Sequence, residues 1–411
     1  MAVAGVRSPV TVAGPRRIRT GFLRTVAWPS AYDSKIWRTI HPVPKPDAPG
    51  RTRPDACPGA LQVHEAADGP LARVRLPGGL IRADQLRVLA DCAATLGNGV
   101  IELTSRGNVQ VRGLAWTAPG PDAVPAAEAF AARIAAAGLL PSTTHERVRN
   151  IVASPFGDRD LVDALDRELC ARPGLARLPG RFLFSIGDLG LEADVTYAEG
   201  RLLLAGRDAG IDVPPERAVA AMLDAAEAFL RLRTTEWRIA ELADGPARIA
   251  AALGGAAGEV RPAPPQPREP GVVAQPSGGL AVQALVPLAR LTPEQAHAIA
   301  GLAAEVRFTP WRTVVVRDVA DPERVRHGLA AAGLVTDPRS PWVGVTACTG
   351  LPGCTRALAD VRADATAWVR AQSAPAAVPV HWSGCERRCG LPRGRVRQMV
   401  ATADGYREEG P

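Results

Sequence analysis

This chain of 411 residues has very little lysine. It also lacks long apolar runs and a Gly-x-Gly-x-x-Gly motif. No run approaches the roughly twenty apolar residues that span a bilayer, so we expect no membrane partner. No secretory signal precedes the chain, and we expect a cytoplasmic protein. Because the glycine-rich motif is missing, we expect no dinucleotide site within the chain. Lysine occurs only at Lys35 and Lys45.

The formal net charge of +7 is unevenly distributed along the chain. Residues 1–55 hold ten basic and three acidic residues, which accounts for the whole excess, and residues 56–411 are neutral overall. A nucleic-acid partner would need a basic surface on the folded body, so we expect none. Residues 1–55 also precede the first regular pattern, and we expect a disordered extension there, a targeting segment being the alternative.

Four of the seven cysteines form two pairs in the last quarter of the chain. Five residues separate Cys348 from Cys354, three separate Cys385 from Cys389, and glycines flank both pairs. Four thiolates on two short loops can enclose an iron–sulfur cluster. Structural zinc is one alternative, although its paired cysteines are usually about two to four residues apart. Disulfides are another, and they require an oxidising compartment.

An internal repeat organises the chain into two related halves. Residues 76–89 parallel residues 286–299, and each stretch has the pattern of a strand, a capped turn and an amphipathic helix. The register resumes after a short deletion, where residues 109–114 match residues 314–319.

Both copies then continue into an alanine-rich helix. Gly138 and Gly333 follow these helices, and glycine is the usual residue at a helix end. Between the halves, residues 253–279 are rich in glycine, alanine and proline, which is typical of an extended linker.

The cysteine spacing and its glycines resemble the sulfite and nitrite reductase superfamily, in which these cysteines hold a 4Fe-4S cluster. The resemblance implies an α+β fold of two pseudo-repeated halves, each a ferredoxin-like unit joined to a larger α+β unit. It implies that Cys348, Cys354, Cys385 and Cys389 are the cluster ligands, with Cys389 nearest the substrate cavity. The expected ranges are a basic extension (1–55), a first ferredoxin-like half-domain (56–120), a cavity domain (121–252), a linker (253–279), a second half-domain (280–338) and a 4Fe-4S-binding domain (339–411).

The resemblance also marks cavity residues. Siroheme enzymes of this superfamily line the substrate cavity with two arginines and two lysines, which bind the oxyanion and supply protons. Arg106 and Arg149 lie in stretches that resemble the two arginine motifs, but Arg181 and Leu183 stand where the lysine pair belongs. Leucine can neither hold an oxyanion nor donate a proton. Siroheme-dependent sulfite or nitrite reduction is therefore the alternative function.

Another branch, the precorrin-3B synthase family, resembles the chain over residues 55–406. This resemblance implies a monooxygenase of aerobic cobalamin biosynthesis that hydroxylates precorrin-3A at C20 and closes a γ-lactone, with O₂ as the oxygen source. Electrons derived from NADH would arrive through a separate reductase or ferredoxin. A non-catalytic iron–sulfur electron carrier is a further alternative.

Within this reading, Arg106, Arg149 and Arg181 are expected to face the cavity. Forked guanidinium groups suit the acetate and propionate carboxylates of a tetrapyrrole.

The precorrin-3B synthase family is also described as holding a mononuclear non-haem iron. Two histidines and a carboxylate commonly bind such an iron. The candidate ligands are His64, His145 and His381.

Two arginines, Arg387 and Arg388, lie between the last two cysteines. Positive charge beside a cluster favours its reduced form and raises its potential. The same arginines could instead dock a polyanionic substrate or an acidic electron donor.

Overall fold

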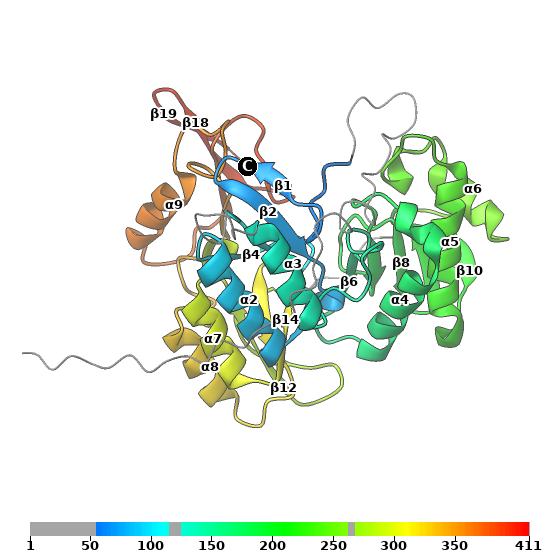
Figure 1. Cartoon of the computed structure of the whole chain (residues 1–411), viewed down its shortest axis with the longest axis horizontal. Coiled ribbons are helices and arrows are strands. Elements are labelled where there is room, and N and C mark those ends of the chain that lie inside the picture. The colour runs from blue at the N-terminus through cyan, green and yellow to red at the C-terminus, as the bar shows by residue number, and fades with distance from the viewer. Residues whose placement is uncertain (1–54, 115–124, 262–267, 411) are drawn as a thin grey trace, which may run out of the picture. The chain divides into compact units, whose positions relative to one another are not determined.

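The computed structural model describes residues 55–114, 125–261 and 268–410. The expected extension, apart from Asp55, and residues 262–267 of the expected linker lie outside these ranges. The described chain is an α+β protein (Figure 1). Its α-helices are α2 (Ala83–Leu96), α3 (Ala126–Ala136), α4 (Arg159–Ala171), α5 (Ala218–Leu232), α6 (Gly245–Ala252), α7 (Pro293–Leu302), α8 (Pro322–Ala331) and α9 (Val361–Arg370).

The two ferredoxin-like repeats each form a five-stranded sheet, and they exchange a short strand. The first sheet has the order β1 (His64–Ala66), β2 (Gly69–Val74), β5 (Val109–Val111), β4 (Ile101–Leu103) and β13 (Arg290–Leu291). The second has the order β11 (Gly271–Ala274), β12 (Leu280–Leu285), β15 (Thr313–Val316), β14 (Glu305–Phe308) and β3 (Leu80–Arg82). Thus β13 of the second half closes the first sheet, and β3 of the first half closes the second.

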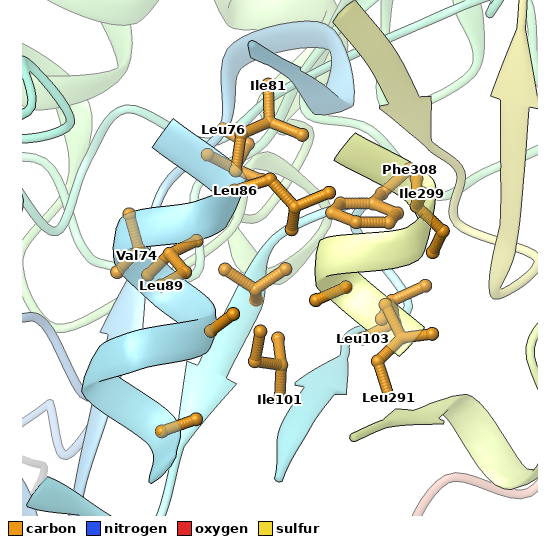
Figure 2. Packing of buried hydrophobic residues seen from close by; sticks show 14 of the residues in the cluster. Val74, Leu76, Ile81, Leu86, Leu89, Ile101, Leu103, Leu291, Ile299 and Phe308 are labelled. Atoms are coloured by element: carbon orange, nitrogen blue, oxygen red, sulfur yellow. The ribbon is translucent and has the colours of Figure 1, made fainter. Parts of the chain in front are cut away.

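One hydrophobic core joins both repeats. Leu86 and Ile101 of the first repeat pack in the same cluster as Leu291, Ile299 and Phe308 of the second, and Figure 2 shows their side chains converging between the helices. The strand exchange and this common core make the two repeats a single packing unit.

Each repeat uses the same glutamine to fix its first helix. Gln85 Oε1 accepts from the Arg82 N–H at 3.1 Å, and Gln295 Oε1 accepts from the Thr292 N–H at 2.9 Å. The amide nitrogen of each glutamine donates to a carbonyl at the end of the next helix, that of Ala137 or Ala332. Each glutamine therefore caps one helix and ties it to a second.

Glycine ends the second helix of each repeat, as the sequence predicts. Gly138 has φ +74° and Gly333 has φ +83°, and the next N–H in each repeat bonds back to Ile134 or Leu329. Both are left-handed helix ends of the type that glycine favours.

The larger units contain two sheets of similar topology. In the first, β6 (Ile151–Ala153), β7 (Phe184–Ile186) and β8 (Val195–Ala198) are parallel, and β9 (Arg201–Leu204) and β10 (Arg207–Asp212) follow antiparallel. In the second, β16 (Val345–Ala347), β17 (Val380–Ser383) and β18 (Arg397–Thr402) are parallel, and β19 (Gly405–Glu409) returns antiparallel. Short 3-10 turns complete the described elements: η1 (Pro77–Gly79), η2 (Pro173–Arg177), η3 (Pro215–Arg217), η4 (Ile239–Glu241) and η5 (Pro287–Ala289).

Part of the stretch expected to be a linker belongs to a β-sheet. Residues 271–274 form β11, which pairs with β12 at the edge of the second ferredoxin-like sheet. The high glycine and proline content of the stretch did not indicate this strand. Its pairing partner is the next strand along the chain, β12. Across the described ranges, none of the helices combines the length and apolar character that a bilayer span requires.

Candidate functional site

The two cysteine loops begin at one edge of the last sheet. Cys348 follows β16 directly, and Cys385 lies just beyond β17, which is the parallel neighbour of β16. Because parallel strands end at the same edge, both loops start side by side. The Gly384 N–H donates to Cys348 Sγ at 3.1 Å, and the Cys348 N–H donates to the Trp382 carbonyl at 2.9 Å.

The four thiols are unpaired, and their environments differ. Cys348, Cys354 and Cys385 are half-buried, whereas Cys389 is exposed. Burial raises the pKa of the Cys348 thiol, and the charges of Cys389 and Cys354 raise it further. Bound iron would remove this penalty, because a thiolate is the ligand form.

The donor set suits a cluster better than a single ion. Among the described residues, no three or more His, Cys, Asp or Glu side chains lie close enough to share one metal ion. A 4Fe-4S cluster spans several atoms and takes one thiolate per iron, so its four ligands need not converge on one point. Four thiols on adjacent loops, with an N–H donated to one sulfur, fit that group.

Buried ion pairs hold the cysteine-bearing unit against the first ferredoxin-like sheet. Arg112 donates twice to Asp68, at 2.9 and 2.8 Å, and also to the Gly353 carbonyl at 2.7 Å, within the first cysteine loop. Glu102, on β4, pairs with Arg362 of α9 at 2.7 Å. These contacts fix the cysteine loops relative to β4 and β5.

A large cavity of about 820 Å³ lies between the first ferredoxin-like repeat and the first larger sheet. Residues of the β4–β5 turn form one wall, and residues 188–194 form another. Six arginines line the cavity: Arg73, Arg106, Arg181, Arg238, Arg261 and Arg393. Arg393 lies four residues after Cys389, so the chain that bears the last cysteine reaches the cavity.

Arg106 lies at this cavity and forms no ion pair with any of the described residues. Its guanidinium has no hydrogen bond or ion pair with any described residue, and burial followed by the charge of Arg238 lowers its pKa to about 10. Gly107 has φ +68°, and a Cβ there would lie 2.9 Å from the Phe308 carbonyl oxygen, so glycine is required beside Arg106. The turn therefore presents to the cavity a guanidinium that makes no direct ion pair within the described residues.

Arg181 also lines the cavity, and Arg149 does not. The Arg181 guanidinium lies 4.9 Å from the centre of the Trp237 ring, which leaves its outer edge available. Arg149 is buried and donates to both oxygens of Asp166, at 2.7 and 2.6 Å. Leu183 is likewise outside the lining and packs in a small cluster beside Trp311.

The histidine candidates do not come together. His64 is exposed on β1. His145 is buried, with Thr144 Oγ1 at 2.9 Å from one ring nitrogen and the Arg172 carbonyl at 3.1 Å from the other. His381 is buried on β17, with Thr346 Oγ1 at 2.8 Å from Nδ1. The described residues therefore offer no set of ligands for a mononuclear iron.

Sequence reasoning missed four of the cavity arginines: Arg73, Arg238, Arg261 and Arg393. Arg73 lies on β2 and Arg75 directly follows its last residue, and two cations two residues apart in an otherwise apolar stretch were an available signal. Arg238 pairs with Asp194 at 2.6 Å across the cavity wall, and nothing in the local sequence indicates that contact.

Comparison with known proteins agrees with this geometry. The family model described as the nitrite/sulfite reductase ferredoxin-like half domain matches residues 64–115 and again 273–325. A ferredoxin–nitrite reductase of Synechococcus elongatus is 27% identical over 392 residues, which are 79% of this chain and 74% of that protein. A precorrin-3B synthase of Sinorhizobium sp is 27% identical over 390 residues, 86% of this chain and 82% of that protein.

A solved structure shows the same fold. The Mycobacterium tuberculosis NirA protein superposes with a TM-score of 0.64 at 20% identity, covering 82% of this chain and 73% of that one. Both ferredoxin-like repeats, and relatives that span most of the chain, point to the same group. The family model and both relatives thus lie within the sulfite/nitrite reductase superfamily, and the solved structure shows the same fold.

Proposed function

We propose that this protein is a monooxygenase of the precorrin-3B synthase type, which hydroxylates precorrin-3A at C20 with γ-lactone formation. The observation that carries the proposal is the arginine-lined cavity of about 820 Å³, in which the Arg106 guanidinium has no counter-ion among the described residues. The similarity to a precorrin-3B synthase over 86% of the chain supports it.

The cavity chemistry favours a polycarboxylate over a small oxyanion. Arg106 and Arg181 offer planar forks that can bind carboxylates in two-point contacts. No lysine occurs after Lys45, so no lysine of residues 55–411 can supply the protons that multi-electron oxyanion reduction consumes. A cavity of this volume also accommodates a large ligand.

Cys348, Cys354, Cys385 and Cys389 would hold a 4Fe-4S cluster, which supplies single electrons when bound. We infer that O₂ is the oxygen source and that NADH-derived electrons arrive through a separate reductase or ferredoxin. Arg106 and Arg181 bind and orient the substrate carboxylates. A mononuclear iron has no ligand set among the described residues, so no step is assigned to it.

Siroheme-dependent nitrite or sulfite reduction is the second candidate. The ferredoxin–nitrite reductase of Synechococcus elongatus is as similar, at 27% identity, as the precorrin-3B synthase. Under this alternative, the same cavity would hold siroheme together with a small oxyanion.

The test is to supply anaerobically purified protein with reductant, precorrin-3A and ¹⁸O₂, and to weigh the product. Incorporation of one ¹⁸O atom, with no turnover of sulfite or nitrite, is expected. An absorption spectrum of the purified protein adds an independent measure, because siroheme gives an intense Soret band and a cluster gives a broad shoulder. Sulfide or ammonia formation without labelled product would establish the alternative.

The matched controls are two arginine variants. Arg106→Gln should lose oxygen incorporation, because it removes a cavity guanidinium that makes no ion pair with any described residue. Arg339→Gln should keep it, because Arg339 is exposed and pairs with Asp337 on the surface.

A further inference from the structure

The turn between β14 and β15 holds an arginine in a backbone conformation that suits glycine. Arg312 has φ +64°. The repeat aligns it with Gly107, which has φ +68° in the equivalent turn between β4 and β5. A residue with a Cβ is disfavoured at positive φ, and such strain tends to be retained at functional positions.

The Arg312 side chain lies beside Gly390, the residue that follows the last cysteine. Arg312 Nη2 and His381 Cε1 lie 3.7 and 3.9 Å from the point where a side chain on Gly390 would begin, and Gly390 follows Cys389. The charge of Arg312 also acts on the buried His381 ring.

Arg312 has no counter-ion within the described part of the chain. Its guanidinium forms no hydrogen bond or ion pair there, and burial lowers its pKa. A partly buried cation of this kind is unfavourable unless an anion accompanies it. The thiolates of the cysteine loops, one of which immediately precedes Gly390, are a group of anions that could accompany it.

The arginines inside the cysteine loop are poorly placed for the same role. Arg388 pairs with Glu386 at 3.1 Å and with Glu409 at 2.7 Å, so its charge is compensated. Arg387 is exposed, where water screens its field. We therefore expect Arg312, in the turn between β14 and β15, to raise the cluster potential in place of these two arginines.

We propose that Arg312 is the countercharge of the anionic cluster held by the two cysteine loops, and that it raises the reduction potential of that cluster. The inference rests on the cluster assignment made above. A cluster with four thiolates gains negative charge on reduction, so an adjacent unpaired guanidinium stabilises the reduced form more than the oxidised form.

The experiment is an anaerobic dithionite titration of the cluster-loaded protein, followed by EPR of the reduced state. Arg312→Gln should lower the ratio of reduced to oxidised cluster at a fixed solution potential by about tenfold, or ~59 mV for one electron. Arg312→Gly should lower it equally and also raise the melting temperature, because glycine suits the backbone there. Arg312→Lys, which keeps the charge, should stay near the wild type.

Two control variants separate charge from shape. Ala289 also has a positive φ (+61°), so Ala289→Gly relieves backbone strain without changing charge. This variant should leave the cluster potential unchanged. Arg388→Gln removes a compensated arginine and should shift the ratio less than twofold. An unchanged potential in both Arg312→Gln and Arg312→Gly, or an equal shift in Arg312→Lys, would overturn the proposal.

Cluster content is measured in every variant. Loss of iron from Arg312→Gln but not from Arg312→Lys would support the countercharge, whereas loss from both would overturn it. Wild-type protein without iron and sulfide would refute the cluster assignment itself, which is a separate failure.

Discussion

Arg106 and Arg149 lie in similar sequence motifs but have different surroundings, so their variants should fail differently. Arg106→Ala should weaken binding of a polycarboxylate tetrapyrrole by about 1.5–3 kcal/mol, because one charged hydrogen bond is lost. The melting temperature should change little, since the guanidinium has no described partner to orphan. Fluorescence quenching with uroporphyrin measures the tetrapyrrole affinity, and Arg339→Ala is the control variant. Undiminished affinity would count against a carboxylate-binding role.

Arg149→Ala should instead destabilise the fold. Its guanidinium is buried, and its removal leaves Asp166 without its two donors, so a loss of about 3 kcal/mol is expected. Chemical denaturation measures the change, and Arg149→Ala with Asp166→Ala should recover part of it. A stable Arg149→Ala protein with impaired substrate binding would contradict this structural role and indicate that Arg149 binds the substrate.

The cysteines give the most direct test of single residues. Cys348→Ser or Cys385→Ser should remove iron and sulfide from the anaerobic protein and lower its melting temperature, because the loops close around the cluster. Cys92→Ser, a variant of a buried cysteine on α2, is the control and should keep its iron. Zinc in place of iron would end the cluster assignment.

The local patterns that the sequence predicted well are those whose causes lie close together along the chain. The cysteine loops, the glycine helix ends at Gly138 and Gly333, and the repeated helices all depend on short spacings. Arg149 is different, because its partner Asp166 lies a helix away on α4. The sequence repeat aligns Arg312 with Gly107, but its neighbour could not be predicted, since only folding brings the β14–β15 turn beside Gly390.

Gln85 and Gln295 have equivalent roles in the two repeats, so the same substitution should have the same kind of effect at both. Each caps one helix and bonds to a carbonyl beyond the next, so Gln85→Leu or Gln295→Leu should cost about 1–2 kcal/mol. The loss should be larger for Gln85, which is buried, and denaturant unfolding of both variants tests the order. Gln372→Leu, at a surface bond within one helix end, is the control.

Asp55 is the first described residue of the chain, and its side chain is bonded into the fold. Its carboxylate accepts from the Gly180 N–H at 2.5 Å and from the Cys57 N–H at 3.0 Å. Deleting residues 1–53 should therefore leave stability and cluster content unchanged, whereas Asp55→Ala should cost about 1–3 kcal/mol. Thermal melting and iron content of both proteins test this, and a collapsed deletion protein would place an essential contact before residue 54.

The strand exchange between the repeats has a consequence for biosynthesis. The first sheet lacks β13 until residue 291 has been made, and β3 lacks its partner β14 until residue 308 has been made. The N-terminal half thus leaves the ribosome with an open sheet edge and a core that is missing Ile299 and Phe308. Such a nascent chain is a natural client for chaperones, and the two halves, synthesised separately, would each need the other in the same cell to become soluble.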